Sequence, residues 1–266
     1  MKKLLAVLLT LSMVFCLAAC GGSDDTAATD DSGSDYDYVV EKGTLVVGIT
    51  DFEPMDYKDG DEWVGFDADM AKAFAESLGV TAEFIEIDWD NKIMELDSKS
   101  IDCVWNGMTL TDEVKSAMET SNAYCDNAQV IVVPADKAEQ YATAEACADL
   151  GFCAESGSAG EAALQDLGYD VTSLQTQSAA LMEVAAGTSD ACVIDLLMAG
   201  AMIGEGTSYE NLTYTAALNS EEYGVGFRKG SDLAEKLNQF FADSYADGSM
   251  LEIAEKYGVQ ESLIEQ

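Results

Sequence analysis

The feature that most constrains the fold is an alternation of short apolar runs with helix-type repeats. The run TLVVGI (Thr44–Ile49) precedes a segment, 65–78, in which apolar residues recur at the four-residue spacing of a helix. A strand-type segment at 80–87, a short helix at 92–97 and a third apolar run at 101–105 follow. This β-α-β-α-β order predicts a parallel sheet with right-handed crossovers.

A second α/β series follows the apolar strand at 128–133. Segments 151–155 and 190–194 have the character of buried strands, and each leads into a helix. The chain ends with a strand at 223–228 and two helices that close at glycines. With 266 residues, 48% of them apolar, the chain is long enough to bury a core in each series. Two similar series predict two lobes with a ligand between them.

Small polar residues follow the third apolar run. Asn106-Gly107-Met108-Thr109 leads into a helix for which Thr111 is a suitable N-cap. In open α/β sheets, ligands collect where strands end and helix N-termini begin. An ordinary strand–helix connection has the same pattern, so this segment alone does not decide between the two.

Two later positions have a comparable context. Ser158 and Glu161 have the spacing of a capping box in a loop of small residues after the strand at 151–155. Asp195 stands at the carboxyl end of the strand at 190–194, before a helix. It is either the N-cap of that helix or an acidic group that faces a ligand.

Composition excludes several function classes. The chain has no histidine, which removes Ser-His-Asp and Cys-His nucleophile arrangements, HExxH zinc sites and histidine general bases. With 13 basic and 50 acidic residues the formal net charge is -37. Such a surface repels phosphate backbones, so we expect no nucleic-acid partner. We interpret the charge itself as a source of solubility.

The cysteines do not form a metal motif. The sequence has no CxxC pair and no histidine, so we predict neither a metal nor a cofactor. Cys147 and Cys153 are the only near pair, and their disulfide state stays open. The cysteines inside strand patterns are expected to be buried thiols: Cys103, Cys153 and Cys192.

The N-terminus has the three regions of an export signal. Lys2 and Lys3 precede an apolar run at 4–17 and the sequence LAAC, which ends at Cys20. LAAC resembles the bacterial lipobox, which implies a signal peptide over 1–19 and a lipid, palmitate included, on Cys20. An ordinary secretory signal cut near residue 19 is the alternative. Residues 20–37 are small and acidic, which predicts a flexible tether. The protein would then lie on the extracytoplasmic face of the cell membrane, anchored by lipid.

Several separate segments match one family in the right order. They are GTLVVGITDFEPM, GFDADMAKAFAESLG, IDCVWNGMTLTDE, NAQVIVV, ESGSAGEAAL, SDACVIDLLMA, YGVGFRKGSDL and DGSMLEIAEKYG. Together they resemble the extracellular solute-binding proteins, family 3, polar amino-acid-binding type, of bacterial ABC transporters. The resemblance implies an α/β, two-lobe hinged fold of the periplasmic-binding-protein type (type II), with a parallel-rich sheet in each lobe.

The same resemblance implies a division of the chain. Lobe 1 would cover 38–132 and return over 223–266, and lobe 2 would cover 133–222. The connecting segments near 132–134 and 220–223 would form the hinge that closes on the ligand.

The resemblance also implies site residues. Phe52 would stack on the ligand side chain, although a loop aromatic packed in the core is the equal alternative. Asn106, Gly107 and Thr109 would offer backbone and hydroxyl groups to the ligand. Trp105 and Met108 would be pocket walls or core residues.

The second lobe would contribute the remaining groups. Ser158 and Ala159 would bind the ligand carboxylate through backbone N–H groups, and for Ser158 this role is compatible with capping. Asp195 would hold the ligand ammonium group. We expect the protein to act as a monomer.

The chain departs from the family at Val114. The family usually has an arginine there, whose guanidinium clamps the ligand α-carboxylate with two parallel bonds. Lys115 points about 100° away on a helix and is a poor substitute. Either the carboxylate is held by Ser158, Ala159 and Thr109 alone, or the ligand lacks an α-carboxylate.

The function implied is that of a substrate-binding lipoprotein of an ABC importer. It would capture a small amino acid or related solute between its lobes and deliver it to membrane permease subunits. One alternative is a dehydratase-type enzyme of the same fold, with Asp51, Glu53 or Asp195 as acid or base. Another is a sensory or surface lipoprotein that binds a different ligand. Nothing in the spacing pairs two carboxylates for acid–base work, so we expect no enzyme.

Overall fold

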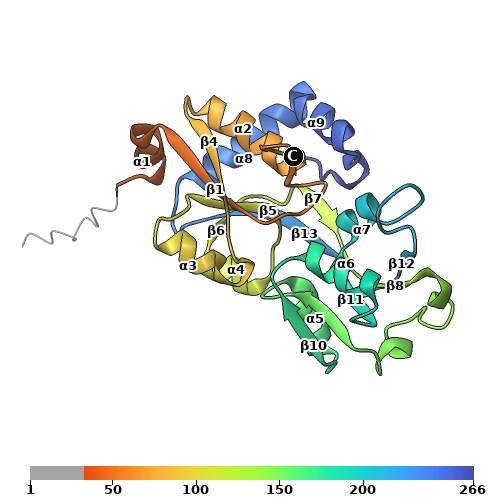
Figure 1. Ribbon diagram of the computed structural model, residues 1–266. Helices are drawn as coiled ribbons and strands as arrows, with labels where there is room; N and C mark the ends of the chain where they lie inside the picture. Colours follow the sequence, from red (N-terminus) through yellow and green to blue (C-terminus); the bar gives the residue numbers. More distant parts are fainter. Residues whose placement is uncertain (1–32) are drawn as a thin grey trace, which may run out of the picture. The chain divides into compact units, whose positions relative to one another are not determined.

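The computed structural model describes residues 33–266, and within that part of the chain two larger sheets form. The first sheet has the spatial order β4 (Thr81–Glu86), β1 (Thr44–Ile49), β5 (Cys103–Thr109), β13 (Glu221–Phe227) and β6 (Glu119–Thr120), with β7 (Cys125–Asn127) also paired to β13 (Figure 1). β1 runs parallel to β4 and to β5, which confirms the predicted parallel arrangement. β13 runs antiparallel to β5, because it returns to this sheet from the second one.

Helices cover both faces of the first sheet (Figure 1). The helices on one face are α2 (Phe66–Ser77), α8 (Leu233–Asp247) and α9 (Ser249–Tyr257), and on the other α3 (Lys92–Asp97) and α4 (Asp112–Ala117). Alternate residues of a strand point to opposite faces. Accordingly Leu45 and Val47 pack against the first set of helices, whereas Val46 packs against the second.

The second sheet has the spatial order β10 (Val171–Leu174), β9 (Phe152–Glu155), β11 (Ala191–Asp195), β8 (Gln129–Pro134) and β12 (Leu212–Ala217). β9, β10 and β11 are parallel, while β8 is antiparallel to β11. The helices α6 (Gln177–Ala186) and α7 (Leu196–Met202) pack on one face and α5 (Ala159–Asp166) on the other. This is the two-lobe α/β fold that the sequence predicted, with one lobe on each sheet.

The N-terminal helix α1 (Asp35–Lys42) corrects the predicted tether, which ran to residue 37. Ser34 caps this helix by accepting a hydrogen bond from the N–H of Asp37 at 3.0 Å. Its hydroxyl also donates to Asp232, and Arg228 forms an ion pair with Asp35 at 3.0 Å. These contacts order the residues from 34 on. The predicted signal peptide and Cys20 lie outside the described residues.

The remaining strands β2 (Tyr57–Asp59) and β3 (Glu62–Val64) form a hairpin next to the first sheet. No helix in 33–266 is long and apolar enough to cross a membrane. The cysteines of this range are all buried free thiols. Cys147 and Cys153 belong to different apolar clusters, on opposite faces of the second sheet, and do not form the disulfide that the sequence left open.

The chain crosses between the sheets twice. Asn127 ends β7 in the first sheet and Gln129 begins β8 in the second. The return runs from Ala217 in β12 to Glu221 in β13. The two crossings are joined by hydrogen bonds, because Gln129 N–H donates to Asn219 Oδ1 at 2.7 Å. They form the double connection expected of a hinge.

These crossings differ from the predicted boundaries. The boundary at 132/133 falls inside β8 and the one at 222/223 inside β13. The run AQVIVV is uniformly apolar, so its composition does not change where the chain leaves one sheet for the other. Strand pairing, which the sequence does not display, decides the position.

Candidate functional site

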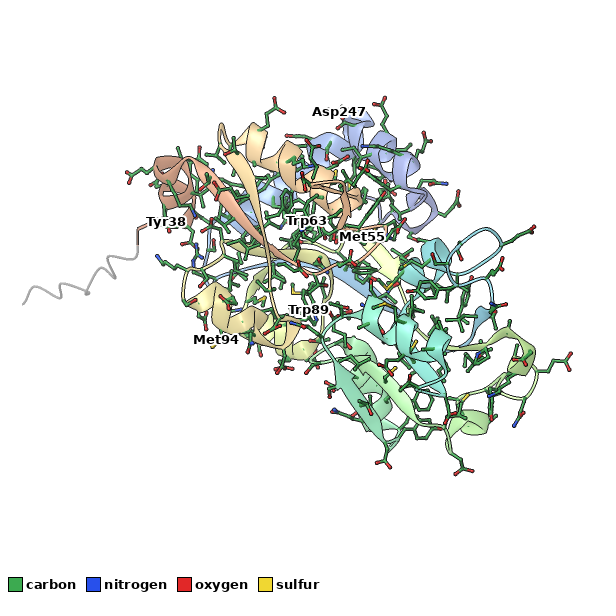
Figure 2. All side chains as sticks on the ribbon, viewed as in Figure 1. Tyr38, Met55, Trp63, Trp89, Met94 and Asp247 are labelled. Carbon is green, nitrogen blue, oxygen red and sulfur yellow. The ribbon has the colours of Figure 1, made fainter. Side chains whose placement is uncertain are left out.

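A cavity of 470 Å³ lies between residues of the two lobes. The first lobe contributes the end of β5, the start of α4 and the segment around Trp89, which Figure 2 labels. The second lobe contributes the ends of β9 and β11 and the start of α5. Because β5, β9 and β11 all present their carboxyl ends here, the cavity occupies the position where ligands bind in open α/β sheets. Its volume suits a small organic solute.

Hydrogen bonds with Thr50 and Asp67 hold the end of β5 in place. The amide of Asn106 donates to the Thr50 hydroxyl at 3.1 Å and its oxygen accepts the Thr50 N–H at 2.7 Å. Gly107 has φ of +53°, and its N–H donates to Oδ2 of Asp67 at 2.6 Å. A Cβ at Gly107 would lie 2.4 Å from the ring of Phe52, so glycine is required there. The four residues of this segment that were named as ligand contacts all line the cavity: Asn106, Gly107, Met108 and Thr109.

Phe52 and Trp105 do not line the cavity. Phe52 is buried and packs edge-on to Tyr223, with 6.3 Å between ring centroids. Trp105 packs between Phe74 and Phe241 in the core of the first lobe. Both side chains thus take the core position that the sequence analysis gave as the equal alternative to a ligand contact. The physical reason is strand alternation, which turns Trp105 towards α2 and α8 while Asn106 faces the cavity.

The start of α5 forms the opposite wall. Ser158 is the N-cap and accepts the N–H of Glu161 at 3.1 Å, while Glu161 Oε2 accepts the N–H of Gly157 at 2.8 Å. Ala159 is the first residue of the helix, and a first-turn N–H has no acceptor within its own helix. The capping spacing in the sequence is thus confirmed, and Ser158 and Ala159 both line the cavity.

Asp195 lies at the end of β11 and lines the cavity while only 4% exposed. Its Oδ1 accepts hydrogen bonds from Tyr223 at 2.6 Å and Gln129 at 2.9 Å, and its Oδ2 accepts one from Gln177. Burial and the nearby Glu221 raise the pKa of Asp195, while the hydrogen bonds oppose the rise. The side chain makes no capping bond to α7, so of the two predicted roles the one facing the cavity is consistent with the structure.

A polar network links Asp195 to the hinge. Asn127 and Gln129 each donate to both Asp195 and Glu221. Thr109 donates its hydroxyl to the same Glu221 oxygen at 2.9 Å. Asp195 and Thr109, which line the cavity, are therefore hydrogen-bonded to residues of the two crossings between the sheets.

Val114 lines the cavity and belongs to the apolar cluster of α3 and α4. The cation among the lining residues is Lys92, which the sequence analysis did not single out. Its ammonium group donates to the carbonyl oxygens of Trp89 at 3.2 Å and of Gly157 at 3.0 Å. Burial lowers the pKa of Lys92, against the attraction of Glu113 and Glu155. Lys92 therefore joins the two lobes across the cavity.

Glu155 is a second lining residue that the sequence analysis missed. It ends β9, is 2% exposed, and its Oε1 has no hydrogen-bond partner among the described residues. Burial and then the charge of Asp195 raise the pKa of Glu155 to about 8. The signal that identified Asp195, an acidic residue at the carboxyl end of an apolar strand, was also present at Glu155. By contrast Asp51 and Glu53, named for the enzyme alternative, do not line the cavity.

Comparison with known proteins identifies the family. The model of the bacterial extracellular solute-binding proteins, family 3, matches residues 45–260. The chain belongs to this family. The resemblance seen in the ordered segments is thereby confirmed, and the extracellular family places the solute-binding part outside the cytoplasm.

Relatives of this solute-binding protein bind amino acids. It is 29% identical to the arginine-binding extracellular protein ArtP of Bacillus subtilis (strain 168) over 264 aligned residues. The alignment covers 97% of this chain and 98% of ArtP. A solved substrate-binding protein of an ABC uptake transporter from Streptococcus pneumoniae with bound histidine is 30% identical, with a TM-score of 0.78 over 85% of this chain and 96% of that one.

Another similar structure is that of an ancestral amino acid-binding protein, AncCDT-1, described as a precursor of cyclohexadienyl dehydratase. It is 30% identical, with a TM-score of 0.77, and the match covers 84% of this chain and 99% of that one. These structures share the two-lobe architecture with this solute-binding protein.

Proposed function

We propose that this protein captures an amino acid or a related amine in the cavity between its lobes and delivers it to the permease of an ABC importer. The observation that carries the proposal is the presence of two complementary groups on the wall that the second lobe contributes to the cavity. Asp195 supplies a buried carboxylate, and the first turn of α5 supplies backbone N–H groups. An ammonium group and a hydrogen-bond acceptor on one small solute satisfy both.

The bound solute would lie with its ammonium group at Asp195 and with any carboxylate near Ala159 and Thr109. Val114 supplies no charge for that carboxylate, so its contribution to affinity would be smaller than that of an arginine clamp. Closure follows from the same placement, because Thr109 and Asp195 belong to different lobes and are joined through Glu221. A solute that contacts both favours the state in which the lobes meet.

Location and transport form part of the proposal. A lipid on Cys20 would hold the protein at the outer face of the membrane, beside its permease. Labelling of cells with a palmitate analogue tests the anchor: the wild-type chain should incorporate label and Cys20→Ala should not. Label on the variant would contradict lipidation at Cys20.

A thermal-shift screen tests the binding function. Protein stripped of bound solutes is heated with each member of a panel of α-amino acids, aliphatic amines and dipeptides. A ligand present at 100 times its Kd stabilises the folded state by about 2.7 kcal/mol, so one chemical class should raise Tm by several degrees. If no member raises Tm, the proposal is wrong.

Two other functions make different predictions. A dehydratase would consume its substrate, and Glu155, whose raised pKa keeps it protonated near neutral pH, would be its acid. Incubation with cyclic acids followed by product analysis separates turnover from binding. A sensory lipoprotein would bind its ligand without a permease, and disruption of the cell's amino-acid permease genes would leave its signalling intact.

A further inference from the structure

The carboxylate of Glu155 is buried and incompletely paired. It lies at the end of β9 beside Leu174 of β10, on the wall of the cavity. Its Oε1 has no hydrogen-bond partner among the described residues, although the side chain is almost wholly enclosed. Buried polar atoms are nearly always paired, and an unpaired carboxylate is costly. An atom in this state, on a cavity wall, points to a partner that the ligand provides.

Asp195, in the same cavity, has more hydrogen-bond donors from the protein than Glu155 has. Side chains of the protein donate to both of its oxygens. These donors are neutral amides and a phenol, and they hold Asp195 in place. Glu155 Oε1 accepts from no group among the described residues, whereas Oδ2 of Asp195 accepts one hydrogen bond and can accept a second.

The charge on the cavity wall has one dominant sign. Lys92 is its only basic lining residue among those described, and its ammonium group already donates to two carbonyl oxygens. The acidic lining residues are Asp112, Glu113, Glu155, Glu161, Asp166 and Asp195. A concave wall of this composition concentrates cations and repels anions.

We propose that Glu155 is a ligand-binding residue that accepts a positively charged nitrogen, and that the cavity therefore selects solutes with a net positive charge, such as basic amino acids and the diamines or guanidinoamines that lack their carboxylate. This inference rests on the proposed function and specifies its ligand class. One cationic nitrogen binds at Asp195 and the second at Glu155. Val114 has no charge, and the ammonium group of Lys92 already donates to two carbonyl oxygens, so neither residue offers a cation to the ligand carboxylate. The decarboxylated analogue therefore binds nearly as well as the amino acid.

The electrostatics agree with this placement. The two carboxylates repel each other when both are ionised, which contributes to the raised pKa of Glu155. A ligand cation between them removes the repulsion and favours ionisation of both. A neutral ligand leaves the repulsion in place.

Isothermal titration calorimetry with two matched sets of ligands tests the inference. The first set is arginine, agmatine and neutral citrulline, and the second is lysine, cadaverine and neutral norleucine. In each set the wild-type protein should bind the cationic members at least tenfold more tightly than the neutral one. Agmatine or cadaverine should bind within tenfold of the parent amino acid.

Glu155→Gln is the deciding variant, and Glu139→Gln is its control, because Glu139 is exposed on the same lobe and does not line the cavity. Glu155→Gln should reduce the ratio of cation to neutral affinity at least tenfold, and Glu139→Gln less than threefold. Without ligand, Glu155→Gln should also melt no lower than the wild-type protein at pH 8, since it removes an unpaired buried charge. That second measurement shows whether the variant folds.

The outcomes separate this inference from the proposed function. Tight binding of citrulline or norleucine, with weaker binding of the cations, overturns the cation selectivity but leaves solute binding intact. An unchanged ratio in Glu155→Gln overturns the role of Glu155. If none of the six ligands nor any member of the thermal-shift panel binds, the proposed function itself fails.

Discussion

The hydroxyl of Tyr223 donates a hydrogen bond to Oδ1 of Asp195 at 2.6 Å, so that a strand of the first lobe holds a carboxylate of the second. Both side chains are buried. Tyr223 also packs edge-on to Phe52, which in turn lies against Gly107 at the end of β5. The position of Asp195 in this structure therefore depends on the packing of the first lobe.

Removing the Tyr223 hydroxyl should weaken the protein more at high pH than at low pH. A hydrogen bond to a charged group contributes roughly 1.5–3 kcal/mol. This bond lowers the pKa of Asp195, so it is stronger to the ionised carboxylate. We expect Tyr223→Phe to lose about 2 kcal/mol of unfolding free energy at pH 8 and clearly less at pH 5, measured by urea denaturation.

Tyr214→Phe is the control for this prediction, because Tyr214 is 41% exposed. It should change stability by less than about 0.5 kcal/mol at both pH values. A loss in Tyr223→Phe that is equal at pH 5 and pH 8 would show that Asp195 does not sense the hydroxyl.

The buried carboxyls should make the ligand-free protein less stable as pH rises. Burial raises the pKa of Asp56, Asp67, Glu155 and Asp195 above that of an unfolded chain. Between the unfolded and folded pKa values the folded state binds more protons, so the free energy of unfolding falls as pH increases. Each unit of pKa difference corresponds to about 1.4 kcal/mol.

Asp67→Asn isolates one of these groups, outside the cavity. The amide oxygen can still accept from Gly107 and Tyr124. We expect the fall in unfolding free energy between pH 5 and pH 8 to be smaller in the variant by about 2 kcal/mol or more. Urea denaturation across this range measures it, and parallel pH profiles of the two proteins would contradict the assignment.

Arg228 should carry a large share of the stability of the first lobe. Its guanidinium donates to the carbonyl of Ile101 at 2.8 Å and lies 3.5 Å from Oδ1 of Asp102, which is fully buried. Arg228 is one of two cations that pair with Asp102, the other being Lys42, and breaking a buried ion pair costs about 3–5 kcal/mol. Arg228→Met should lose about 3 kcal/mol by urea denaturation.

The neighbouring Lys229→Met is the matched control, since the Lys229 side chain is 57% exposed and 4.0 Å from Glu119. Exposed pairs contribute less than about 1 kcal/mol. If the two substitutions cost the same, the burial of the Arg228 network does not determine its energy.

Val114→Arg should restore a carboxylate clamp. The cavity wall at this position would then present a guanidinium, and a bidentate pair with a carboxylate is a strong, charge-assisted interaction. A contribution of roughly 1.5–3 kcal/mol corresponds to about a 10- to 100-fold change in affinity. We expect the variant to shift the preference from agmatine towards arginine by that factor.

The ratio of two ligands on one protein is the correct readout here. Val114 is 4% exposed in an apolar cluster, so arginine there also lowers stability, and the ratio cancels this effect. An arginine-to-agmatine ratio equal to that of the wild-type protein would show that the missing clamp has no consequence.

Local patterns in the sequence were sufficient for much of the fold. The apolar runs at 44–49 and 128–133 and the capping spacing at Ser158 each correspond to an element of the structure. Local patterns did not show which strands pair with each other or which distant residues contact each element. The antiparallel direction of β13, the sheet change after Asn127 and the order of α1 depend on partners far away in the chain.

The lack of information on distant partners also determined which site residues could be predicted from the sequence. Asn106 and Asp195 stand at strand ends and were named as site residues. For Phe52 and Trp105, ligand contact and core packing were equal alternatives, and both side chains lie in the core. The face to which a side chain points within a fully buried strand is not visible in an all-apolar run. Lys92 was missed because it reaches the cavity from a short helix, by contacts to Trp89 and Gly157 that span the two lobes.

The central claim is that the cavity between the lobes binds one small solute, and a blocked cavity tests it most directly. Ala159→Trp places an indole in the cavity at the start of α5, while Ala148→Trp places one on the exposed surface away from it. Calorimetric titration should use the solute that gives the largest thermal shift. The account predicts one site per chain in the wild-type protein and in Ala148→Trp, and no binding to a folded Ala159→Trp. Unchanged binding by Ala159→Trp would contradict it, because the solute would then bind elsewhere.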